Sequence, residues 1–502
     1  MSSFKRMNRI SKEVTSRLNR ISRESMFKGP QRSKSSKLQR RGSKVFDSTQ
    51  NKDSFEDAAV LVSDMTGFTS GTRKHGIVHV ASVIVRMRQI CLPILHKHGA
   101  MWIGTEGDNL IVLLPNAAAA IGSALGMRDA ISRHNASLPE SRSHHQIQLG
   151  GIGIHCGGPV VLDRKSDALR GAVSSLAYFI GEELCSDGTV LASQTIVERL
   201  GDGSSHLGCT FREVPQEEGD ESAPLPVYEV VPSASSSVLG LFSSDAEPLP
   251  AADDDRYLHK SLLPLAKRFA CSDDASLAAL DAELASLLRP AAVLMFRVFA
   301  DAAEASSGYS TADAESAKKS EEACLRALRP IFKRYRGNEL EPMLWVFESP
   351  LDAVKAALAA ARASRSAADA PLPSERFRVS GFGVHHGSLL LIEGTDVHWG
   401  DPVNTSSKLG QDLAKDGEVL VSSAARDALH QAAPSWVRRA LEMRPREITI
   451  SKVEMVAYST IERSWTAQMA ALFCGGGGGA SSKPATQEPP PTQLTSPGEV
   501  RA

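Results

Sequence analysis

VLVSDMTGFTS at residues 60–70 and GTEGDNLIVLLP at residues 104–115 decide the fold. The first run is apolar and β-branched up to Asp64 and then turns, which predicts a short buried strand. The second run opens on a Gly-Asp turn at Asp108 and predicts the return strand of a hairpin. If the two strands are antiparallel neighbours, both carboxylates lie at one edge of the sheet. Paired carboxylates in such a place indicate hard divalent cations and a phosphate-bearing substrate.

The composition is that of a globular protein with room for two or three domains. The chain has 502 residues, of which 42% are hydrophobic and 23% are charged, and its formal net charge is −1. Its seven cysteines are dispersed and form no CxxC pair, which favours a reducing compartment over a disulfide framework. No apolar run reaches the roughly 18 residues of a membrane span, and no signal peptide is recognisable. These features predict an intracellular protein, cytoplasmic or attached peripherally to a membrane or the cytoskeleton.

Residues 1–55 are predicted to form a basic N-terminal tail. Residues 1–50 hold fourteen Lys and Arg against three Asp and Glu. Apolar residues recur at spacings of three and four from Phe4 to Ile21, which predicts an amphipathic helix within residues 1–28. Such a helix fits an anionic membrane surface, a calmodulin-like partner or a cytoskeletal filament, and the alternative is a flexible basic tail. No aromatic or groove-reading motif accompanies it, so no nucleic-acid partner is expected.

Residues 56–231 are predicted to form a first globular unit. Helical spacing from His75 to His98 and an alanine-rich run at 117–131 alternate with the predicted strands. The expected order is β-α-β-β-α-β, which is typical of an α/β sandwich with a mostly antiparallel sheet. Residues 232–257 are rich in Ser, Pro, Ala and Asp and predict a linker, and residues 258–290 predict a helical lead-in to a second unit.

Residues 291–462 form that second unit and repeat the first. VLMFRVF at 293–299 matches residues 60–66, ELEPMLWVF at 339–347 matches 106–114, and GFGVHHGSL at 381–389 matches 151–159. The offsets are 233, 233 and 230 residues, and an offset this constant indicates a duplication. Residues 463–502 contain a run of five glycines and a proline-rich end, which predict a disordered C-terminal tail.

Both units resemble the class III nucleotide cyclase catalytic domains, the adenylate/guanylate cyclase homology family. In the first unit the resemblance is carried by VLVSDMTGFTS, HGAMWIGTEGDNLIVLLP and LGGIGIHCGGPV, and in the second unit by HWGDPVNTSSKLGQDLAKDGEVLVSS. It implies an α/β (α+β) fold of two ferredoxin-like nucleotide cyclase domains. It also implies that these domains pack head to tail as an intramolecular pseudo-heterodimer, with active sites at their interface.

The resemblance assigns the metal ligands to the first unit. The family's two metal aspartates fall on Asp64 and Asp108, and the resemblance implies that they hold two Mg²⁺ or Mn²⁺ ions. In the second unit the same positions fall on Arg297 and Glu341. An arginine would repel a divalent cation, so no second metal site is expected.

The resemblance assigns the transition-state residues to the second unit. The family's asparagine, which orients the ribose, and its arginine, which stabilises the pentavalent phosphorus, fall on Asn404 and Lys408. In the first unit they fall on Ser175 and Phe179, neither of which neutralises phosphate charge. The losses are complementary, so one composite site is expected and its pseudo-symmetric counterpart is not.

The turn after the first metal aspartate is expected to bind the triphosphate. Thr66, Gly67, Phe68 and Thr69 follow Asp64 where a strand passes into a helix. Backbone N–H groups at a helix N-terminus form a ready anion site.

The positions that read the base depart from the family. The purine-selecting position is usually Lys for ATP or Glu for GTP, and it falls on Gly104 in the first unit and on Gly337 in the second. The second purine contact falls on Val397. Lys408 in place of arginine keeps the charge but loses the bidentate fork.

The sequence therefore predicts a nucleotide cyclase that converts a nucleoside triphosphate to the 3′,5′-cyclic monophosphate and pyrophosphate. ATP is preferred over GTP because no guanine-selecting Glu stands at Gly104 or Gly337. The alternative is a weak or inactive pseudocyclase that acts as a nucleotide-binding, scaffold or regulatory protein.

Overall fold

The computed structural model describes most of the two predicted units. The described residues are 45–46, 52–164, 167–186, 188–201, 206–215, 225–233, 249–251, 256–271, 273–299, 311–370, 372, 375–450 and 453–463. The predicted helix within residues 1–28, most of the linker at 232–257 and the tail after residue 463 lie outside them.

The first unit is built on a seven-stranded sheet in the order β10-β11-β9-β6-β3-β5-β4. Its strands are β3 (Ala59–Met65), β4 (Trp102–Glu106), β5 (Asn109–Leu114), β6 (Leu149–Cys156), β9 (Val190–Ser193), β10 (Cys209–Glu213) and β11 (Val227–Pro232). Its helices are α2 (Phe68–His75), α3 (Ile77–Lys97), α4 (Ala117–Ser137), α5 (Ala172–Phe179) and α6 (Gln194–Leu200), with short turns η1 (Glu140–His145) and η2 (Ile180–Leu184). A small second sheet contains β1 (Val45–Phe46), β2 (Lys52–Phe55), β7 (Val160–Asp163) and β8 (Ala168–Arg170).

The central strands confirm the predicted α+β, ferredoxin-like arrangement. Strand β3 pairs antiparallel with both β5 and β6, and β4 pairs antiparallel with β5. The spatial order β6-β3-β5-β4 is that of a split β-α-β-β-α-β unit, with α3 and α4 as the two helical connections. The alternation of apolar strands with helical spacing in the sequence encodes this order.

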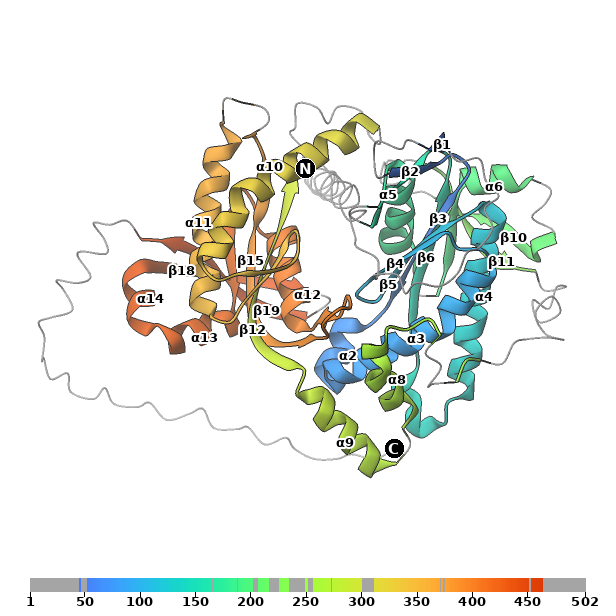
Figure 1. Cartoon of the computed structure of the whole chain (residues 1–502), viewed down its shortest axis with the longest axis horizontal. Helices are drawn as coiled ribbons and strands as arrows, with labels where there is room; N and C mark the ends of the chain where they lie inside the picture. Colours follow the sequence, from blue (N-terminus) through green and yellow to red (C-terminus); the bar gives the residue numbers. More distant parts are fainter. Residues whose placement is uncertain are drawn as a thin grey trace, which may run out of the picture.

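The second unit has a sheet in the same order, β13-β14-β12-β15-β17-β19-β18, and Figure 1 shows the two sheets on opposite sides of the molecule. Its strands are β12 (Leu288–Phe299), β13 (Asn338–Glu341), β14 (Leu344–Phe347), β15 (Arg378–Leu391), β16 (His398–Trp399), β17 (Glu418–Ser422), β18 (Leu441–Ile450) and β19 (Val453–Glu462). Its helices are α10 (Thr311–Arg334), α11 (Pro350–Ala368), α12 (Asp401–Ser407), α13 (Ser423–Ala432) and α14 (Pro434–Ala440), with a π-helical turn η6 (Lys408–Leu413).

Both units press one short helix directly onto the sheet through glycine. A Cβ atom on Gly153 of β6 would lie 2.2 Å from the Gly181 nitrogen, and one on Gly383 of β15 would lie 2.3 Å from the Gly410 nitrogen. At each place the helix continues as a π-helical turn, η2 after α5 and η6 after α12. Such turns recur at functional sites. The same close approach therefore places α5 and α12 at equivalent positions in the two units.

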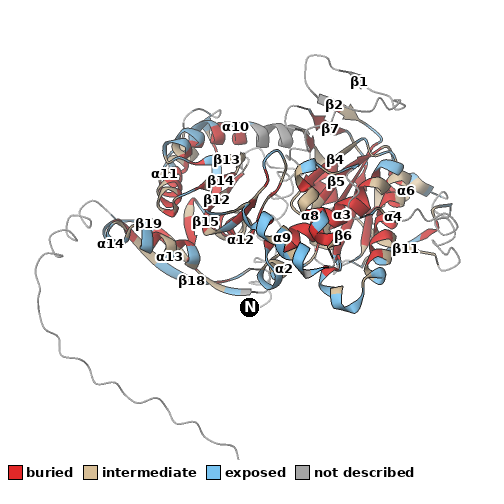
Figure 2. Ribbon diagram, turned by 60° about the horizontal axis from the view of Figure 1, so that its bottom comes forward, coloured by how far each residue is buried: buried red, intermediate tan, exposed pale blue. Residues whose placement is uncertain are grey.

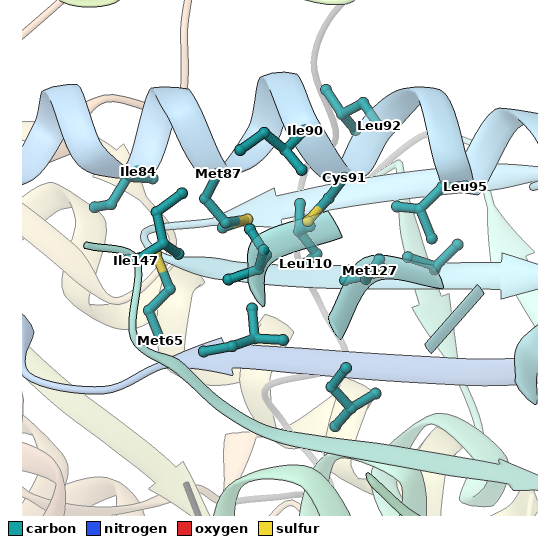
Figure 3. Close-up of a cluster of buried hydrophobic side chains, with 14 of the residues drawn as sticks. Met65, Ile84, Met87, Ile90, Cys91, Leu92, Leu95, Leu110, Met127 and Ile147 are labelled. Atoms are coloured by element: carbon teal, nitrogen blue, oxygen red, sulfur yellow. The ribbon is translucent and has the colours of Figure 1, made fainter. Parts of the chain in front are cut away.

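Helix α3 is the centre of the first unit. It is buried on nearly all sides, and Figure 2 shows it in the red interior with the strands. Met87, Cys91 and Leu95 reach from α3 toward the strands in Figure 3, where Leu110 of β5 lies. Among the described residues α3 alone has the length and hydropathy of a membrane span, but 83% of that window is buried inside the fold. A core helix passes the same test.

The two units share one apolar core. The end of β15 and the β16 hairpin contribute Leu390, Ile392 and Trp399 to the same buried cluster as α3. The connecting segment, with η4 (Lys260–Leu262), α8 (Leu263–Ala270) and α9 (Asp274–Ala285), packs through α8 and α9 against α3. Figure 1 shows this segment along the bottom of the view, before β12 enters the second sheet.

The glycine contact in the second unit should be essential for its stability. Gly383→Ala places a methyl group 2.2 Å from the Ser406 oxygen, so we expect the free energy of unfolding to fall by about 2 kcal/mol or more, the scale of overpacking a core. Chemical denaturation measures it. Gly158→Ala is the matched control, because its methyl would meet only Val173 at 3.8 Å. Equal stability of the two variants would contradict the close-packing account.

Candidate active site

Asp64 lies near the end of the central strand β3. The five residues before it are buried, and the pairing of β3 with β6 shifts register between Ser63 and Met65. This irregularity releases Asp64 from the regular ladder, and its carboxylate accepts a hydrogen bond from the Met65 amide at 2.7 Å. Strand β3 is hydrogen-bonded to β5 on one side and to β6 on the other, so the backbone that carries the carboxylate is rigid.

Asp108 lies in the two-residue turn that joins β4 to β5. Glu106 pairs with Asn109 across this turn, and Gly107 takes the left-handed conformation with φ of 58°. Two further contacts hold the hairpin: the Tyr178 hydroxyl donates to Glu106 at 2.7 Å, and the Asn109 amide donates to Glu182 at 2.7 Å.

The structure brings Asp64 and Asp108 together. Burial and the charge of Asp64 raise the pKa of Asp108 well above its usual range, and Arg88 opposes this only in part. Two carboxylates that repel each other in a half-buried place fit Mg²⁺ or Mn²⁺, because these cations take oxygen ligands and would offset both charges. The donor set therefore fits the expected metal.

The turn from Thr66 to Thr69 is only partly available for a phosphate. Gly67 precedes α2 with φ of 87°, a left-handed conformation that glycine adopts freely. The Thr66 amide, however, donates to the Gln148 carbonyl at 2.9 Å, so it cannot also bind an anion. A cavity of about 430 Å³ touches this turn and Asp108 together. The amides at the start of α2 are thus the remaining donors.

Asn404 and Lys408 lie on α12 and at the start of η6. Helix α12 contacts α2 of the first unit, so the helix with the predicted transition-state residues lies beside the helix that follows the predicted phosphate turn. The Lys408 ammonium is bound to Asp412 at 2.9 Å, and its side chain is 36% exposed. Asp412 also binds Arg297, which stands where the first unit has Asp64, at 3.0 Å. The sequence did not single out Asp412, although its i+4 spacing from Lys408 was a signal.

The equivalent helix of the first unit has no phosphate-binding side chain at these positions. Ser175 and Phe179 of α5 are both buried. The Ser175 hydroxyl donates to the Gly171 carbonyl within its own helix at 3.3 Å. Neither side chain is therefore exposed to meet a phosphate.

The structure corrects the assignment of Glu341. In the first unit Val62, Ile111 and Gly104 stand in one row across β3, β5 and β4. In the second unit the equivalent row is Met295, Leu344 and Glu341. Glu341 therefore takes the row of Gly104, to which the resemblance assigns purine selection, and not the place of Asp108.

The cause is a shorter hairpin. Strand β13 turns back at Pro342 and Met343, and its pairing with β14 has a register shift between Glu339 and Glu341. Among the described residues of the second unit, no residue reaches the place of the Gly107–Asp108 turn. Gly337, which the repeat offset assigns to the purine position, lies before β13 and faces the Phe347 ring. The sequence offset between the repeats is the same before and after this hairpin, so the offset alone does not reveal the deletion.

The structure buries Val397, on which the second purine position falls. Val397 is 1% exposed and belongs to the apolar core, so its side chain cannot meet a base. Its neighbours His398 and Asp396 are polar, and the His398 ring lies 2.8 Å from the Glu341 carboxylate. Burial would lower the pKa of His398, but the bond to Glu341 and the charges of Glu341 and Asp396 leave that pKa raised.

A cluster of imidazoles lies near the cavity at the junction of α2 and α3. Metal-ligand atoms of His79, His144 and His145 lie within 4.8 Å of one another. Yet His79 contacts the His144 carbonyl at 3.0 Å and Arg268 at 3.4 Å, and His145 contacts Arg142 at 3.2 Å. A divalent cation would have to displace both guanidinium groups. The His145 ring instead packs edge-on against Phe269 of α8, and the Arg142 guanidinium lies over the same ring, so these two residues hold the connecting segment.

Comparison with known proteins adds a limited likeness. No family model matches the chain. It is 25% identical over 85 residues to the serine/threonine-protein kinase pkn2 of Myxococcus xanthus, which is 17% of this chain and spans only 10% of that protein.

Among solved structures, an adenylate/guanylate cyclase/hydrolase from Silicibacter pomeroyi is 23% identical, with a TM-score of 0.30, and the match covers 36% of this chain and 100% of that one. The adenylyl cyclase CyaB from P. aeruginosa is 18% identical, with a TM-score of 0.29 and coverage of 36% and 96%. The guanylate cyclase domain of RhGC from Catenaria anguillulae is 16% identical, with a TM-score of 0.30 and coverage of 36% and 98%. At these scores the likeness determines neither activity nor substrate.

Buried histidines should make the first unit sensitive to acid. Burial is the largest cause that lowers the pKa of His79 and His134 to about 4 and of His145 to about 3. The unfolded chain takes up these protons below pH 6.5 and the folded chain does not, so stability is full above pH 6.5 and falls as the pH drops toward 4. We expect His134→Gln to reduce the slope of unfolding free energy by about 1.4 kcal/mol per pH unit between pH 6 and 4.5.

Denaturant titrations across that pH range measure the slope. His430→Gln, an exposed position on α13, is the control and should keep the wild-type slope. A wild-type slope in His134→Gln would contradict the assignment of a neutral, buried His134.

Proposed function

We propose that this chain is a nucleotide cyclase with one composite site, which forms a 3′,5′-cyclic nucleotide and pyrophosphate from a nucleoside triphosphate. The observation that carries the proposal is the pair Asp64 and Asp108, whose charges repel each other, beside the start of α2, the helix that α12 of the second unit contacts. The sequence resemblance implies this division, in which one domain supplies the metal carboxylates and the other supplies the cationic residues.

Asp64 and Asp108 are the ligands of the proposed metal pair. Mg²⁺ or Mn²⁺ bound there would lower the pKa of the ribose 3′-hydroxyl and supply positive charge to the triphosphate. The amides of Gly67, Phe68 and Thr69 at the start of α2 would donate to phosphate oxygens, with the helix dipole in their favour.

The second unit supplies the remaining groups. Asn404 would orient the ribose, and Lys408 would face the charge that develops at the α-phosphorus. In the reaction the 3′-oxygen attacks that phosphorus, the hydroxyl proton passes to solvent, and pyrophosphate leaves with the bridging oxygen. Catalysis here is mainly positioning and charge stabilisation. Lys408 must exchange its bond to Asp412 for one to phosphate, which weakens its contribution.

The preference for ATP does not survive the corrected register, and GTP is the better substrate candidate. That preference rested on the absence of Glu from the purine-selecting positions of both units. In the corrected register Glu341 occupies this position in the second unit. A carboxylate only accepts hydrogen bonds, and guanine presents two donors, N1–H and the 2-amino group, on its Watson–Crick edge. His398 would orient Glu341 toward the base.

The second candidate is a pseudocyclase that binds a nucleotide without turnover. The observation in its favour is the group of Arg297, Asp412 and Lys408, in which the one expected catalytic cation is already paired. Lysine also lacks the bidentate geometry of arginine.

Removal of one metal carboxylate tests the proposed function. We expect Asp64→Asn to lower kcat by about 100-fold or more, the scale seen when one electrostatic element of a transition state is removed. Cyclic nucleotide formation from GTP and from ATP, with Mn²⁺ or Mg²⁺, measures this. Asp129→Asn, which breaks a surface pair on α4, is the control. Nucleotide binding without product in the wild type would favour the pseudocyclase.

Glu341 should set the choice of base. We expect Glu341→Gln to lower kcat/KM for GTP by about 10- to 100-fold, the value of a hydrogen bond to a charged group, and to leave ATP unchanged or improved. Glu339→Gln is the matched control on the same strand, because Glu339 is bound by Arg329 of α10. An unchanged ratio of GTP to ATP turnover would remove Glu341 from base recognition.

A further inference from the structure

Arg88 is a buried arginine in the middle of an apolar environment. It lies in the second half of α3, among the apolar residues of the shared core, and its side chain is 3% exposed. Transfer of a lone guanidinium to such a place is strongly unfavourable, so its partners explain why the position is charged.

The partners of Arg88 come from both units. Its guanidinium donates to the Asp396 carboxylate of the second unit at 3.0 and 2.6 Å, a bidentate pair. The same group donates to the Gly107 carbonyl of the first unit at 2.8 Å. Its charged carbon lies 5.1 Å from the centre of the Trp399 ring. One side chain thus joins the β4–β5 hairpin to the β15–β16 loop.

Both ends of this link adjoin the proposed site. Gly107 immediately precedes Asp108 in the turn, so the Arg88 bond fixes the backbone that carries a metal carboxylate. Asp396 lies two residues before His398, which contacts Glu341. The link therefore runs from the metal side of the site to the side proposed to read the base.

The pairing is a strong constraint in physical terms. Burial would raise the pKa of Asp396, but the adjacent Arg88 charge and hydrogen bond leave it lowered, so the pair is ionic. A bidentate pair between a guanidinium and a carboxylate fixes both the distance and the angle between the two groups. A lysine ammonium cannot form such a pair. When the second unit is undocked, Arg88 loses Asp396 and the hairpin tip loses its counterpart.

We infer that Arg88 is a positioning residue that locks the Asp108 turn to the base-reading side of the second unit, so that the metal carboxylates are correctly placed only when the two units are docked. The inference rests on the proposed function, which it deepens.

The kinetic test separates placement from charge. Arg88→Met should lower kcat by about 10- to 100-fold, the usual effect of losing an outer partner of a metal ligand. It should also weaken binding of Mn²⁺ alone, measured by calorimetry on the full chain, because a displaced Asp108 is a poorer ligand; loss of the Arg88 charge without displacement would strengthen that binding instead. Arg88→Lys should recover only part of kcat. Arg86→Met is the matched control: Arg86 lies on the same helix, is 6% exposed, and binds the Pro250 carbonyl.

A double variant guards against a merely structural effect. Arg88→Met leaves Asp396 buried without its cation, and Arg88→Met with Asp396→Met removes both charges and should restore stability. Because the Gly107 bond is still missing, kcat should stay low. Recovery of kcat in the double variant, or a kcat in Arg88→Met within about twofold of Arg86→Met, would overturn the inference.

Hydrogen exchange keeps the test independent of activity. In Arg88→Met, backbone amides of the peptide 102–114 should exchange about 10-fold faster than in the wild type or in Arg86→Met, since the hairpin tip opens locally. Unchanged protection would overturn the role of Arg88. If the wild type forms no product from any nucleotide, the proposed function fails while this readout still decides whether Arg88 fixes the hairpin.

Discussion

The burial of the β15–β16 end of the second unit in the apolar core around α3 is the constraint on which the rest depends. Leu390, Ile392 and Trp399 lose their solvent contact only in this position, and the hydrophobic effect makes that burial favourable. It brings α12 beside α2 and places Asp396 against Arg88. The proposed composite site exists only because this docking brings residues from distant parts of the chain into one place.

The two units have the same strand order but differ in the length of the hairpin at one edge of the sheet. In the first unit the β4–β5 hairpin continues far enough to carry Asp108 beside Asp64. In the second unit the β13–β14 hairpin turns back two rows earlier, and Arg297 stands where a metal carboxylate would be needed. A shorter edge hairpin leaves the core intact, because the central strands carry the buried residues. One fold can therefore carry two different edge hairpins, on which the proposed division into a metal half and a base-reading half depends.

Charges within the second unit limit what it can do alone. Arg297 and Lys408 both bind Asp412. The positive charge that Lys408 would offer to a substrate is therefore already paired with a carboxylate of the second unit. The ion pair of Lys408 is partly exposed, and such pairs are weak enough to exchange. A triphosphate with several negative charges would compete with one carboxylate for Lys408, and the outcome separates a cyclase from a nucleotide-binding pseudocyclase.

The sequence by itself determined the elements, their order and the duplication. Apolar periodicity predicts α3, α4 and the central strands, because burial on one face imposes a period that can be read locally. It also singled out Asp64 and Asp108, since both adjoin strands whose pairing follows from the pattern.

Only the tertiary structure decided the row of Glu341, the burial of Val397 and the partners of Arg88. A hairpin deletion compensated within a repeat leaves the offset unchanged, so strand register is visible only when the partners are paired. The amide of Thr66 is likewise lost to Gln148 through a contact between distant segments. The partners of Arg88 belong to two domains, and no local pattern encodes which carboxylate a buried arginine meets, because that contact arises only when separately folded surfaces dock.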